Sequence, residues 1–497
     1  MFEHPDQVLS VAQAYFGKPR VLVIGDVMLD RYLWGDVNRI SPESPVPVVR
    51  VTRETEVMGG AANVASNLAS LGARVSLAGY IGQDESGTRL RNKALEAEIE
   101  TVGLISIPGR PTTIKTRVIG GHQQMLRIDI EVNTTAPDAE SDLLSAISTI
   151  INASGSDEGD IPAAIVLSDY AKGVLSEPVC HTVIAIARSR DIPVFAAPKG
   201  TDYRKYTSAT ALVLNKSELA SATHTTAHHI DAMTNGARLL QRVLSLEYVL
   251  LTRGEQGISL IEPDSEQHAP AMARQVFDVS GAGDTVIGTF AMGVLAGLTR
   301  IDSVRLANVA AGIVVGKVGT VAVSRTELLT ELTRQRDLEQ IDKICNWDKL
   351  GRRLAEWRNH GERIVFTNGC FDLLHAGHVV YLEKARREGN RLIVGLNTDA
   401  SVRRIKGDGR PIIHEGDRAR VLAALASVDA VVLFDDDTPI NLIRAVKPDV
   451  LVKGGDYTED GVIGASDVRQ WGGIVALIPY IEGRSTTRII KRIEATD

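Results

Sequence analysis

A glycine-rich segment of the chain, VFDVSGAGDTV at 276–286, ends in an acidic residue that could do chemistry. The apolar residues at 286–291 recur at helical spacing, so the glycines belong to a turn that begins a helix. Unpaired backbone N–H groups at such a turn point outward with the positive end of the helix dipole, which favours a bound phosphate. We therefore expect Gly281, Ala282 and Gly283 to form an anion hole.

Asp284 follows these glycines directly. A carboxylate there could accept the proton of an attacking hydroxyl while the backbone amides stabilise charge that develops on a transferred phosphoryl group. The turn would then couple an anion hole to a general base. The alternative is that Asp284 is only a first-turn residue, favourable to the helix dipole.

Polar residues near the start of the chain could bind a sugar. Asp26, Asp30 and Asp36 lie at or beyond the end of a predicted strand, where an open α/β sheet binds its ligands. The segment GGAANVASNLASLG at 59–72 joins a close Gly-Gly turn to an amphipathic helix. Carboxylates and amides suit sugar hydroxyls, and ordinary turn and cap roles are the alternative. The predicted sugar-binding residues here are Asp30, Gly59, Gly60 and Asn63.

Two alternating segments, VPVVRVT at 46–52 and TTIKTRVIGGHQQMLRID at 112–129, predict an antiparallel flap beside the main sheet. The second segment concentrates three cations, Lys115, Arg117 and Arg127. A plain sugar needs hydroxyl partners, whereas a sugar phosphate needs fixed positive charge, so these residues favour a phosphorylated substrate. A solvated face of a strand pair is the alternative. We choose Lys115 and Arg127 as the phosphate clamp.

Residues 18–325 resemble the ribokinase family of sugar kinases, because DVSGAGDT matches its closing signature and NKSE its N-x-x-E element. The resemblance implies ATP as co-substrate and Mg²⁺, with Glu218 in the metal environment. Ala197, in AAPKG, stands where close relatives commonly carry an aspartate, whereas Lys199 is retained. Besides the glycine turn, the implied ATP site comprises Asn215, Lys216, Ser217, Glu218, Thr252, Gly254 and Asn308.

The segment RIVFTNGCFDLLHAGHVVYLEKAR is the most informative in the second half. A strand that ends in Thr367, Asn368 and Gly369 leads to a helix with His375 and His378 on one face. Two imidazoles above a helix N-terminus can bind a triphosphate and stabilise charge on its α-phosphate while an incoming oxyanion displaces pyrophosphate. Surface histidines and a zinc site are the alternatives, although the usual zinc spacing and a third ligand are lacking.

Residues 360–497 resemble the H-x-G-H nucleotidyltransferase superfamily, which includes the cytidylyltransferases and the pantetheine phosphate adenylyltransferases. Its later Ser-Thr-Thr element is present in GRSTTRII. No metal ligand set is visible in this half, so Mg²⁺ would be held chiefly by the nucleotide's own phosphates and water. The predicted nucleotide- and phosphate-binding residues are Thr367, Asn368, Gly369, Phe371, Lys406, Arg410, Lys453, Ser485, Thr486 and Thr487.

These residues need two sheets to position them. Short apolar runs, such as RVLVIGD in the first half and RIVFTNG in the second, alternate with helical patterns, as βαβ units do around a parallel sheet. Between the halves, 324–358 is polar and helical without glycine turns. We predict an α/β fold: a ribokinase-like three-layer kinase domain with a small β flap at 1–335, a linker at 336–347 and a smaller Rossmann-like nucleotidyltransferase domain at 348–497.

Composition limits the class of protein. The 55 Lys and Arg residues against 62 Asp and Glu give a net charge of −7 without long single-sign blocks, which argues against a nucleic-acid binder. The odd number of cysteines, 3, fits a reducing compartment. Neither a signal-peptide pattern nor an apolar run of membrane-spanning length is present. We expect a cytoplasmic protein without nucleic-acid or membrane partners, and a homodimer formed through the kinase domain.

The domain order, the flap cations and the segments NTDASVRRIKGDGRPI, LVKGGDY and RSTTRII resemble the family of bifunctional heptose 7-phosphate kinases and heptose 1-phosphate adenylyltransferases of bacterial lipopolysaccharide precursor synthesis. The resemblance implies that the first domain uses ATP to phosphorylate O1 of D-glycero-D-manno-heptose 7-phosphate. A separate phosphatase would remove the 7-phosphate, and the second domain would transfer AMP from ATP to the 1-phosphate, which gives ADP-heptose and pyrophosphate.

The residues alone predict less: phosphoryl transfer to an anionic sugar and nucleotidyl transfer to a phosphate. Two alternatives stay open at this point. One is a cytidylyltransferase that acts on another sugar or polyol phosphate. The other is that one half is a nucleotide sensor without catalytic activity.

Overall fold

The computed structural model describes residues 2–121, 123–152, 161–224, 230–271, 276–455, 458 and 461–479. The chain divides into two compact units, 1–333 and 334–497. The boundary falls inside helix α10 (Arg325–Asp342), and the residues predicted as a linker lie in α10, in strand β14 (Ile344–Cys345) and at the start of α11 (Trp347–Asn359). The domain limits drawn from the sequence stay a prediction.

The first unit contains a nine-stranded sheet in the order β13-β12-β11-β10-β9-β8-β1-β4-β5. Strands β11 to β5 in that order are parallel, and β12 and β13 add an antiparallel edge. The apolar runs predicted as strands are all present. The strands are β1 (Arg20–Gly25), β4 (Arg74–Gly82), β5 (Glu100–Ile107), β8 (Ala164–Ser168), β9 (Val194–Ala197), β10 (Ala211–Asn215), β11 (Tyr248–Thr252), β12 (Ile258–Ile261) and β13 (Glu266–Ala269).

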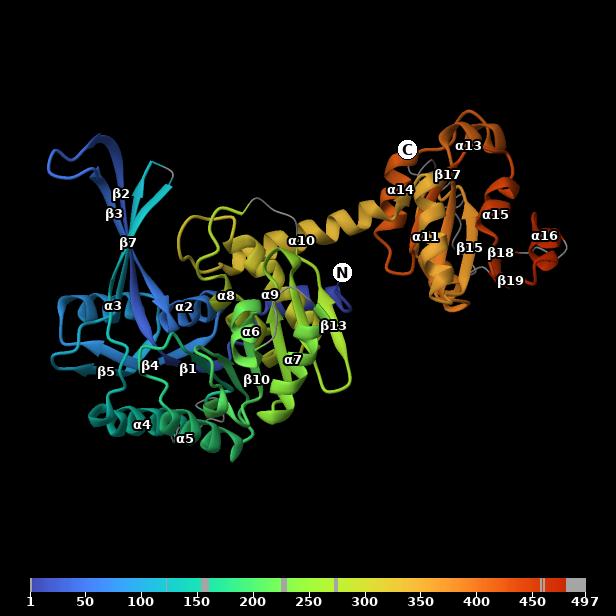
Figure 1. The fold of residues 1–497 in the computed structure, drawn as a ribbon. Helices are drawn as coiled ribbons and strands as arrows, with labels where there is room; N and C mark the ends of the chain where they lie inside the picture. Colours follow the sequence, from blue (N-terminus) through green and yellow to red (C-terminus); the bar gives the residue numbers. More distant parts are fainter. Residues whose placement is uncertain are drawn as a thin grey trace, which may run out of the picture. The chain divides into compact units, whose positions relative to one another are not determined.

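Helices cover both faces of this sheet, which gives the predicted three layers (Figure 1). Because successive side chains of a strand point to opposite faces, Val21 and Val23 pack into one core while Leu22 and Ile24 pack into the other. The helices of the first core are α1 (Pro5–Gln13), α2 (Ala61–Leu71), α3 (Glu85–Glu96), α8 (Ala282–Leu295), α9 (Arg300–Val314) and α10. Those of the second core are α4 (Pro137–Ile151), α5 (Glu177–Arg188), α6 (Lys216–Thr223) and α7 (Ile230–Val243).

The flap is a separate four-stranded sheet in the order β3-β2-β6-β7, and its strands rise beyond α2 and α3 in Figure 1. The prediction of a purely antiparallel flap is wrong, because its central pair, β2 and β6, is parallel. Asp30 and Asp36 lie inside β2 rather than beyond a strand end. An alternating pattern indicates a strand but not its partner. The four strands are β2 (Val27–Ile40), β3 (Pro47–Gly60), β6 (Ile114–Gly120) and β7 (Gln123–Ile130).

The second unit is a smaller parallel sheet in the order β14-β17-β16-β15-β18-β19, as predicted. Helices α11, α15 (Ile440–Val446) and α16 (Ala465–Gln470) pack in one core, and α12 (Ala376–Arg387) and α14 (Glu415–Ala423) in the other. No helix among the described residues has the length and apolar character to span a membrane. The remaining elements are α13 (Asp399–Lys406), β15 (Ile364–Gly369), β16 (Arg391–Asn397), β17 (Ala430–Phe434), β18 (Val450–Gly454) and β19 (Ile474–Ile478).

Two candidate active sites

The first site lies where the strand order of the large sheet reverses, between β1 and β8, which is where open α/β sheets bind ligands. Asp26 follows β1, and its carboxylate accepts the backbone N–H groups of Tyr170 (2.8 Å), Lys172 (3.0 Å) and Val174 (3.1 Å). These bonds fix the loop that follows β8. Asp26 therefore has the turn-and-cap role that the sequence left open, and it holds the loop rather than a sugar.

Helix α8 begins at the predicted glycine turn. Gly281 is its N-cap with φ +76°, and a Cβ at this position would lie 2.7 Å from Nδ2 of Asn63. Only glycine lets the turn approach helix α2 this closely. Asp284, in the first turn of α8, is 6% exposed. Its Oδ2 accepts a hydrogen bond from Asn63 Nδ2 (2.8 Å), and its Oδ1 accepts one from the hydroxyl of Tyr170 (2.6 Å).

The environment of Asp284 tunes its acidity. Burial raises the pKa of Asp284 to about 6, and the charge of Asp30 acts in the same direction. The hydrogen bonds from Tyr170 and Asn63 and the charge of Lys115 oppose this rise. A carboxyl group that titrates near neutral pH can accept a proton from an alcohol and release it again. The pKa thus suits the predicted general base.

A cavity of about 190 Å³ is lined both by the glycine turn of α8 and by the Asn215–Glu218 segment. Ala282, Lys216, Ser217 and Gly254 are not among its lining residues, and Asn308 instead donates its side-chain amide to the carbonyl of Pro270 (2.7 Å). The predicted residues that line it are Asp284, Gly281, Gly283, Asn215, Glu218 and Thr252. The others are Asp169, Tyr170, Ala197, Pro198, Lys199, Val213 and Leu214.

Asn215 and Glu218 form the N-terminal cap of α6. The side chain of each accepts the backbone N–H of the other, both at 2.9 Å, and Lys199 Nζ lies 3.1 Å from Oε1 of Glu218. Both carboxylate oxygens of Glu218 are therefore engaged. This donor set fits Mg²⁺ that is held by the phosphates of a nucleotide and by water, with Glu218 as an indirect contact.

Asp30 is a buried carboxylate at the base of the flap, 4% exposed. It forms an ion pair with Arg117 (2.7 Å) and accepts a hydrogen bond from the hydroxyl of Thr320 (2.8 Å). A Cβ at Gly59 would lie 2.7 Å from Oδ2 of Asp30, so only glycine fits beside this carboxylate on the side of β3, where Gly60 ends the strand. Among the flap cations, Arg117 is therefore the one that is paired with Asp30.

The two predicted clamp residues lie on the paired strands β6 and β7, where the charge of Arg127 acts on Lys115, but they have different partners. Lys115 is half-buried, and its ammonium lies 5.4 Å from the centre of the ring of Tyr170, next to Asp284. Arg127 is exposed on β7 and forms an ion pair with Asp129 (2.9 Å). Of these two residues, only Lys115 contacts a hydrogen-bond partner of Asp284 in the described structure, because its ammonium lies against the ring of Tyr170.

The second site begins at helix α12. His375 is its N-cap, and Nδ1 of His375 accepts the backbone N–H of Gly377 (3.1 Å). Nδ1 of His378 accepts the backbone N–H of His375 (3.4 Å), so each helps to cap the helix. This network assigns the proton of each neutral ring to Nε2. Both rings can therefore donate a hydrogen bond to an anion at the helix N-terminus.

His378 is held neutral by its surroundings. Burial lowers the pKa of His378 to about 4, with contributions from the charges of His375 and Lys406. The ring of Phe371 packs edge-on against that of His378, 5.3 Å between centres. Lys406, the last residue of α13, is exposed and close enough to act electrostatically on His378. The three predicted residues Phe371, His378 and Lys406 are therefore neighbours.

Lys453 and Asn368 meet where the strand order of the smaller sheet reverses, between β15 and β18. Lys453 Nζ donates to Oδ1 of Asn368 (2.8 Å), and burial lowers the pKa of Lys453 to about 8. Thr367 is fully buried, and its hydroxyl bonds to that of Tyr381 (2.6 Å), so it supports the site from inside the sheet. Gly369 ends β15, beside the ring of Phe371.

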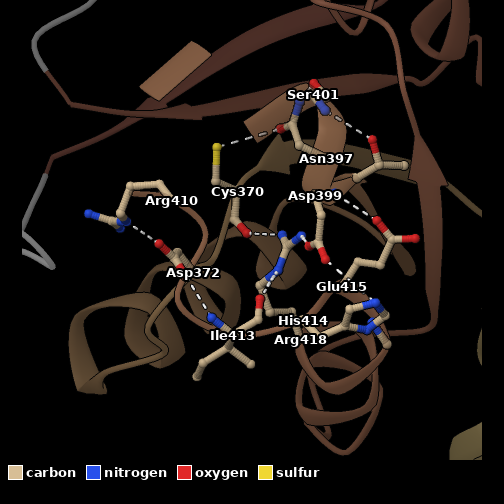
Figure 2. A network of polar contacts seen from close by, with 12 residues as sticks. Cys370, Asp372, Asn397, Asp399, Ser401, Arg410, Ile413, His414, Glu415 and Arg418 are labelled. Carbon is tan, nitrogen blue, oxygen red and sulfur yellow. Dashed lines mark hydrogen bonds and ion pairs between the residues drawn. The ribbon is translucent and has the colours of Figure 1, made fainter. Parts of the chain in front are cut away.

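Two buried charges tie together the loops around His375, and Figure 2 shows both. Asp372 pairs with Arg410 and accepts the backbone N–H of Ile412 (2.7 Å). Arg418, 2% exposed, donates to the carbonyl of Cys370 (2.5 Å) and to Oδ1 of Asp399 (2.6 Å). The side chain of Arg410, predicted as a phosphate ligand, is thus already paired with a carboxylate.

Four functional residues escape the sequence reasoning: Tyr170, Thr320, Asp372 and Arg418. One signal could have found Tyr170, because it directly follows a predicted strand at the edge of the sheet where ligands bind. Asp372 lies within the segment that carries the two histidines, whereas Thr320 and Arg418 come from segments without a motif. Ser485, Thr486 and Thr487 lie outside the described residues, so their part in the site stays a prediction.

Comparison with known proteins assigns both units. Residues 18–327 match the family model "pfkB family carbohydrate kinase", and residues 366–492 match "Cytidylyltransferase-like". Two solved structures share the fold of the first unit: a ribokinase from Arabidopsis thaliana complexed with ribose and ATP (TM-score 0.50, 19% identity, 63% of this chain and 98% of that chain) and phosphofructokinase-2 from Escherichia coli in complex with potassium (TM-score 0.53, 16% identity, 64% of this chain and 98% of that chain).

Relatives of the same domain order span the full chain. A protein from Methylobacillus flagellatus named "Bifunctional protein HldE" is 54% identical over 490 residues, which cover 98% of this chain and 99% of the relative. A protein of the same name from Magnetococcus marinus is 51% identical over 491 residues, which cover 98% of this chain and 100% of the relative. At this identity and coverage, both units and their order are shared.

Proposed function

Because the chain belongs to the family of bifunctional HldE proteins, with a carbohydrate kinase domain followed by a nucleotidyltransferase domain, we propose that it catalyses two steps of ADP-heptose synthesis. The first unit transfers the γ-phosphoryl group of ATP to O1 of D-glycero-D-manno-heptose 7-phosphate. A separate phosphatase then removes the 7-phosphate. The second unit transfers AMP from ATP to heptose 1-phosphate and releases pyrophosphate.

The observation that carries the kinase assignment is the position of Asp284, which is buried beside the anion-hole glycines in the same cavity as Asn215 and Glu218. Asp284 accepts the proton of the O1 hydroxyl as that oxygen attacks the γ-phosphorus. The backbone N–H groups of 281–283 stabilise the charge on the transferred group. Asp30 orients sugar hydroxyls.

Fixed positive charge supports a phosphorylated sugar as the acceptor. Lys115 lies beside the ring of Tyr170, next to the general base, so its ammonium can bind the 7-phosphate while O1 faces Asp284. Arg127 is the second predicted ligand of that phosphate and lies on the edge strand of the same flap. In this proposal Arg127 exchanges Asp129 for the substrate.

In the second unit, His375 and His378 offer Nε2–H donors at the start of α12. They bind the triphosphate and stabilise the α-phosphate while an oxygen of heptose 1-phosphate attacks it and the bond to pyrophosphate breaks. Lys453 supplies a positive charge at the reversal point of the sheet. The attacking phosphate oxygen is already ionised, so this step needs no general base.

Mg²⁺ is part of this proposal in both reactions, bound mainly by ATP and water and, in the kinase, indirectly by Glu218. When bound, it neutralises phosphate charge. A homodimer through the kinase domain is supported by the flap, since the edge strand β7 exposes the apolar side chains of Leu126 and Ile128. We place the enzyme in the cytoplasm, which supplies ATP and keeps its cysteines reduced.

The direct experiment follows both products by mass spectrometry. With ATP, heptose 7-phosphate should give the 1,7-bisphosphate, and heptose 1-phosphate should give ADP-heptose, whereas unphosphorylated heptose should be a much poorer kinase substrate. Because residues 366–492 match a cytidylyltransferase-like model, CTP is the competing donor. A preference for CTP, or equal turnover of phosphorylated and unphosphorylated sugars, would overturn the corresponding half of the proposal.

A further inference from the structure

Tyr170 contacts both the base and the cation of the kinase site. Its hydroxyl donates a 2.6 Å hydrogen bond to Oδ1 of Asp284, and the ammonium of Lys115 lies 5.4 Å from the centre of its ring. The backbone N–H of Tyr170 donates a hydrogen bond to the carboxylate of Asp26, and this bond fixes the main chain at Tyr170. Among the described residues, no other side chain contacts both Asp284 and Lys115.

The hydrogen bond from Tyr170 favours the ionised form of Asp284. A donor to a carboxylate stabilises the anion and opposes the effect of burial. The other donor is Asn63 on α2, and the charges that face Asp284 are Asp30 on β2 and Lys115 on β6. The phenol itself stays protonated, because burial and the charges of Asp284, Asp30 and Glu218 raise the pKa of Tyr170 well above its usual value.

We propose that Tyr170 is a positioning residue of the kinase reaction, which keeps the Asp284 carboxylate ionised and oriented for proton transfer and links it to the phosphate-binding cation Lys115. The inference rests on the proposed role of Asp284 as the general base. Tyr170 keeps its own proton throughout, and the proton of O1 goes to Asp284.

The test is the pH dependence of the kinase kcat/KM for the sugar phosphate in the full-length chain. In Tyr170→Phe, Asp284 loses one of its two donors, so the acid limb should move to higher pH by about one unit. Above pH 8, where the carboxylate still ionises, the rate should fall less than about tenfold, and KM for ATP should stay unchanged. An acid limb that coincides with the wild type would overturn the proposal.

Tyr80→Phe is the matched control, since it also removes a buried phenol hydroxyl, one without a hydrogen-bond partner among the described residues. Its profile should match the wild type. A second substitution keeps the shape of the side chain: 3-fluorotyrosine at position 170 has a more acidic phenol and donates a stronger hydrogen bond, so the acid limb should move to lower pH. If Tyr170→Phe has no activity, the fluorotyrosine variant provides the test instead. An acid limb of this variant that stays in place or moves to higher pH would overturn the proposal.

Asp284→Asn distinguishes a failure of the proposed general base from a failure of the proposed role of Tyr170. If that variant keeps kinase activity, the proposed general base is wrong. If it loses the activity while Tyr170→Phe leaves the acid limb unmoved, the kinase assignment stands and only the role of Tyr170 is lost.

Discussion

The imidazole rings of His375 and His378 stack with their centres 3.9 Å apart, and backbone N–H groups of the same helix turn bond to Nδ1 of each. Two stacked imidazolium cations would repel each other, so this arrangement disfavours protonation of both rings at once. Each neutral ring then carries its proton on Nε2. The pair offers Nε2–H donors above a positive helix end, an arrangement that suits an anion.

The first prediction concerns the charge of His378. Because burial and the neighbouring cations lower the pKa of His378 to about 4, its ring should be neutral in the free protein at pH 6 and protonated on Nε2. Nitrogen NMR of labelled histidine measures both properties, with the signal assigned by its loss in His378→Ala. ATP should raise the pKa, since phosphate charge favours the cation. A charged His378 at pH 6 without nucleotide would contradict the tautomer assignment.

The second prediction separates the two activities. Asp284→Asn should lower phosphorylation of the sugar about 100- to 10,000-fold, the usual contribution of a general base, and should leave adenylyl transfer within twofold. His378→Ala should do the reverse. Both rates are measured on the same purified chain. Loss of both activities in either folded variant would mean that the two sites are not independent.

The third prediction concerns stability. The pKa of Asp284 is raised to about 6 in the folded protein, above its unfolded value near 4, so its stabilising contribution is complete below about pH 4 and is lost as the pH rises through 6. At pH 8 the buried carboxylate costs up to about 3 kcal/mol. Asp284→Asn should therefore raise the thermal midpoint of the first unit at pH 8 and have little effect at pH 4. Calorimetry at both pH values checks this, and equal shifts would contradict it.

The sequence predicts those features of the fold and of the two sites that depend on residues close together along the chain. The strands, the glycine turn of α8 and the capping pair Asn215 and Glu218 follow from spacings of a few residues, which a sequence displays directly. The bond between Asn63 and Asp284 joins residues 221 positions apart, and no local pattern indicates it. The sequence nevertheless indicates Asn63 and Asp284 singly, because each lies in its own recognisable segment.

Residues without a local motif could not be found in this way. Arg418 acts through the carbonyl of Cys370 and the carboxylate of Asp399, partners that only the folded chain brings together. Strand β2 pairs with β6 in parallel, and the sequence does not indicate this, because side chains alternate in the same way in parallel and antiparallel strands. Arg410 and Arg127, the predicted phosphate ligands, each have a carboxylate partner in the folded chain, and such distant or cross-loop pairing is not visible in the sequence.

The fourth prediction concerns Lys453. Burial lowers the pKa of this ammonium to about 8, so it is charged below that pH and loses its charge above it. In the free enzyme, binding of ATP to the second unit should therefore weaken between pH 7 and pH 9. Lys453→Met should bind ATP about tenfold more weakly at pH 7 and lose this dependence. Isothermal titration of the wild type and of Lys453→Met with a non-hydrolysable ATP analogue measures it, because the kinase site is the same in both proteins and the difference between them reports the second unit. An alkaline limb that persists in Lys453→Met would assign it to another group.

The fifth prediction tests the buried anchor of the second site. Arg418→Met keeps most of the volume of the side chain but leaves Asp399 buried without its cation, together with the carbonyls of Cys370 and Ile413. Removing one partner of a buried ion pair costs about 3 kcal/mol, so the thermal midpoint of the second unit should fall by several degrees. Adenylyl transfer should fall as well, because the loop that carries His375 loses its tie to Arg418.

Arg444→Met is the matched control for that variant, since it removes an exposed ion pair with Asp467 (2.6 Å) from the same unit. Exposed pairs are screened by solvent and contribute little to stability, so its midpoint should change little. Equal effects of the two substitutions would mean that the buried network does not hold the loop. A lower midpoint with unchanged transfer would mean that Arg418 stabilises the fold but does not position His375, so the two measurements together separate stability from positioning.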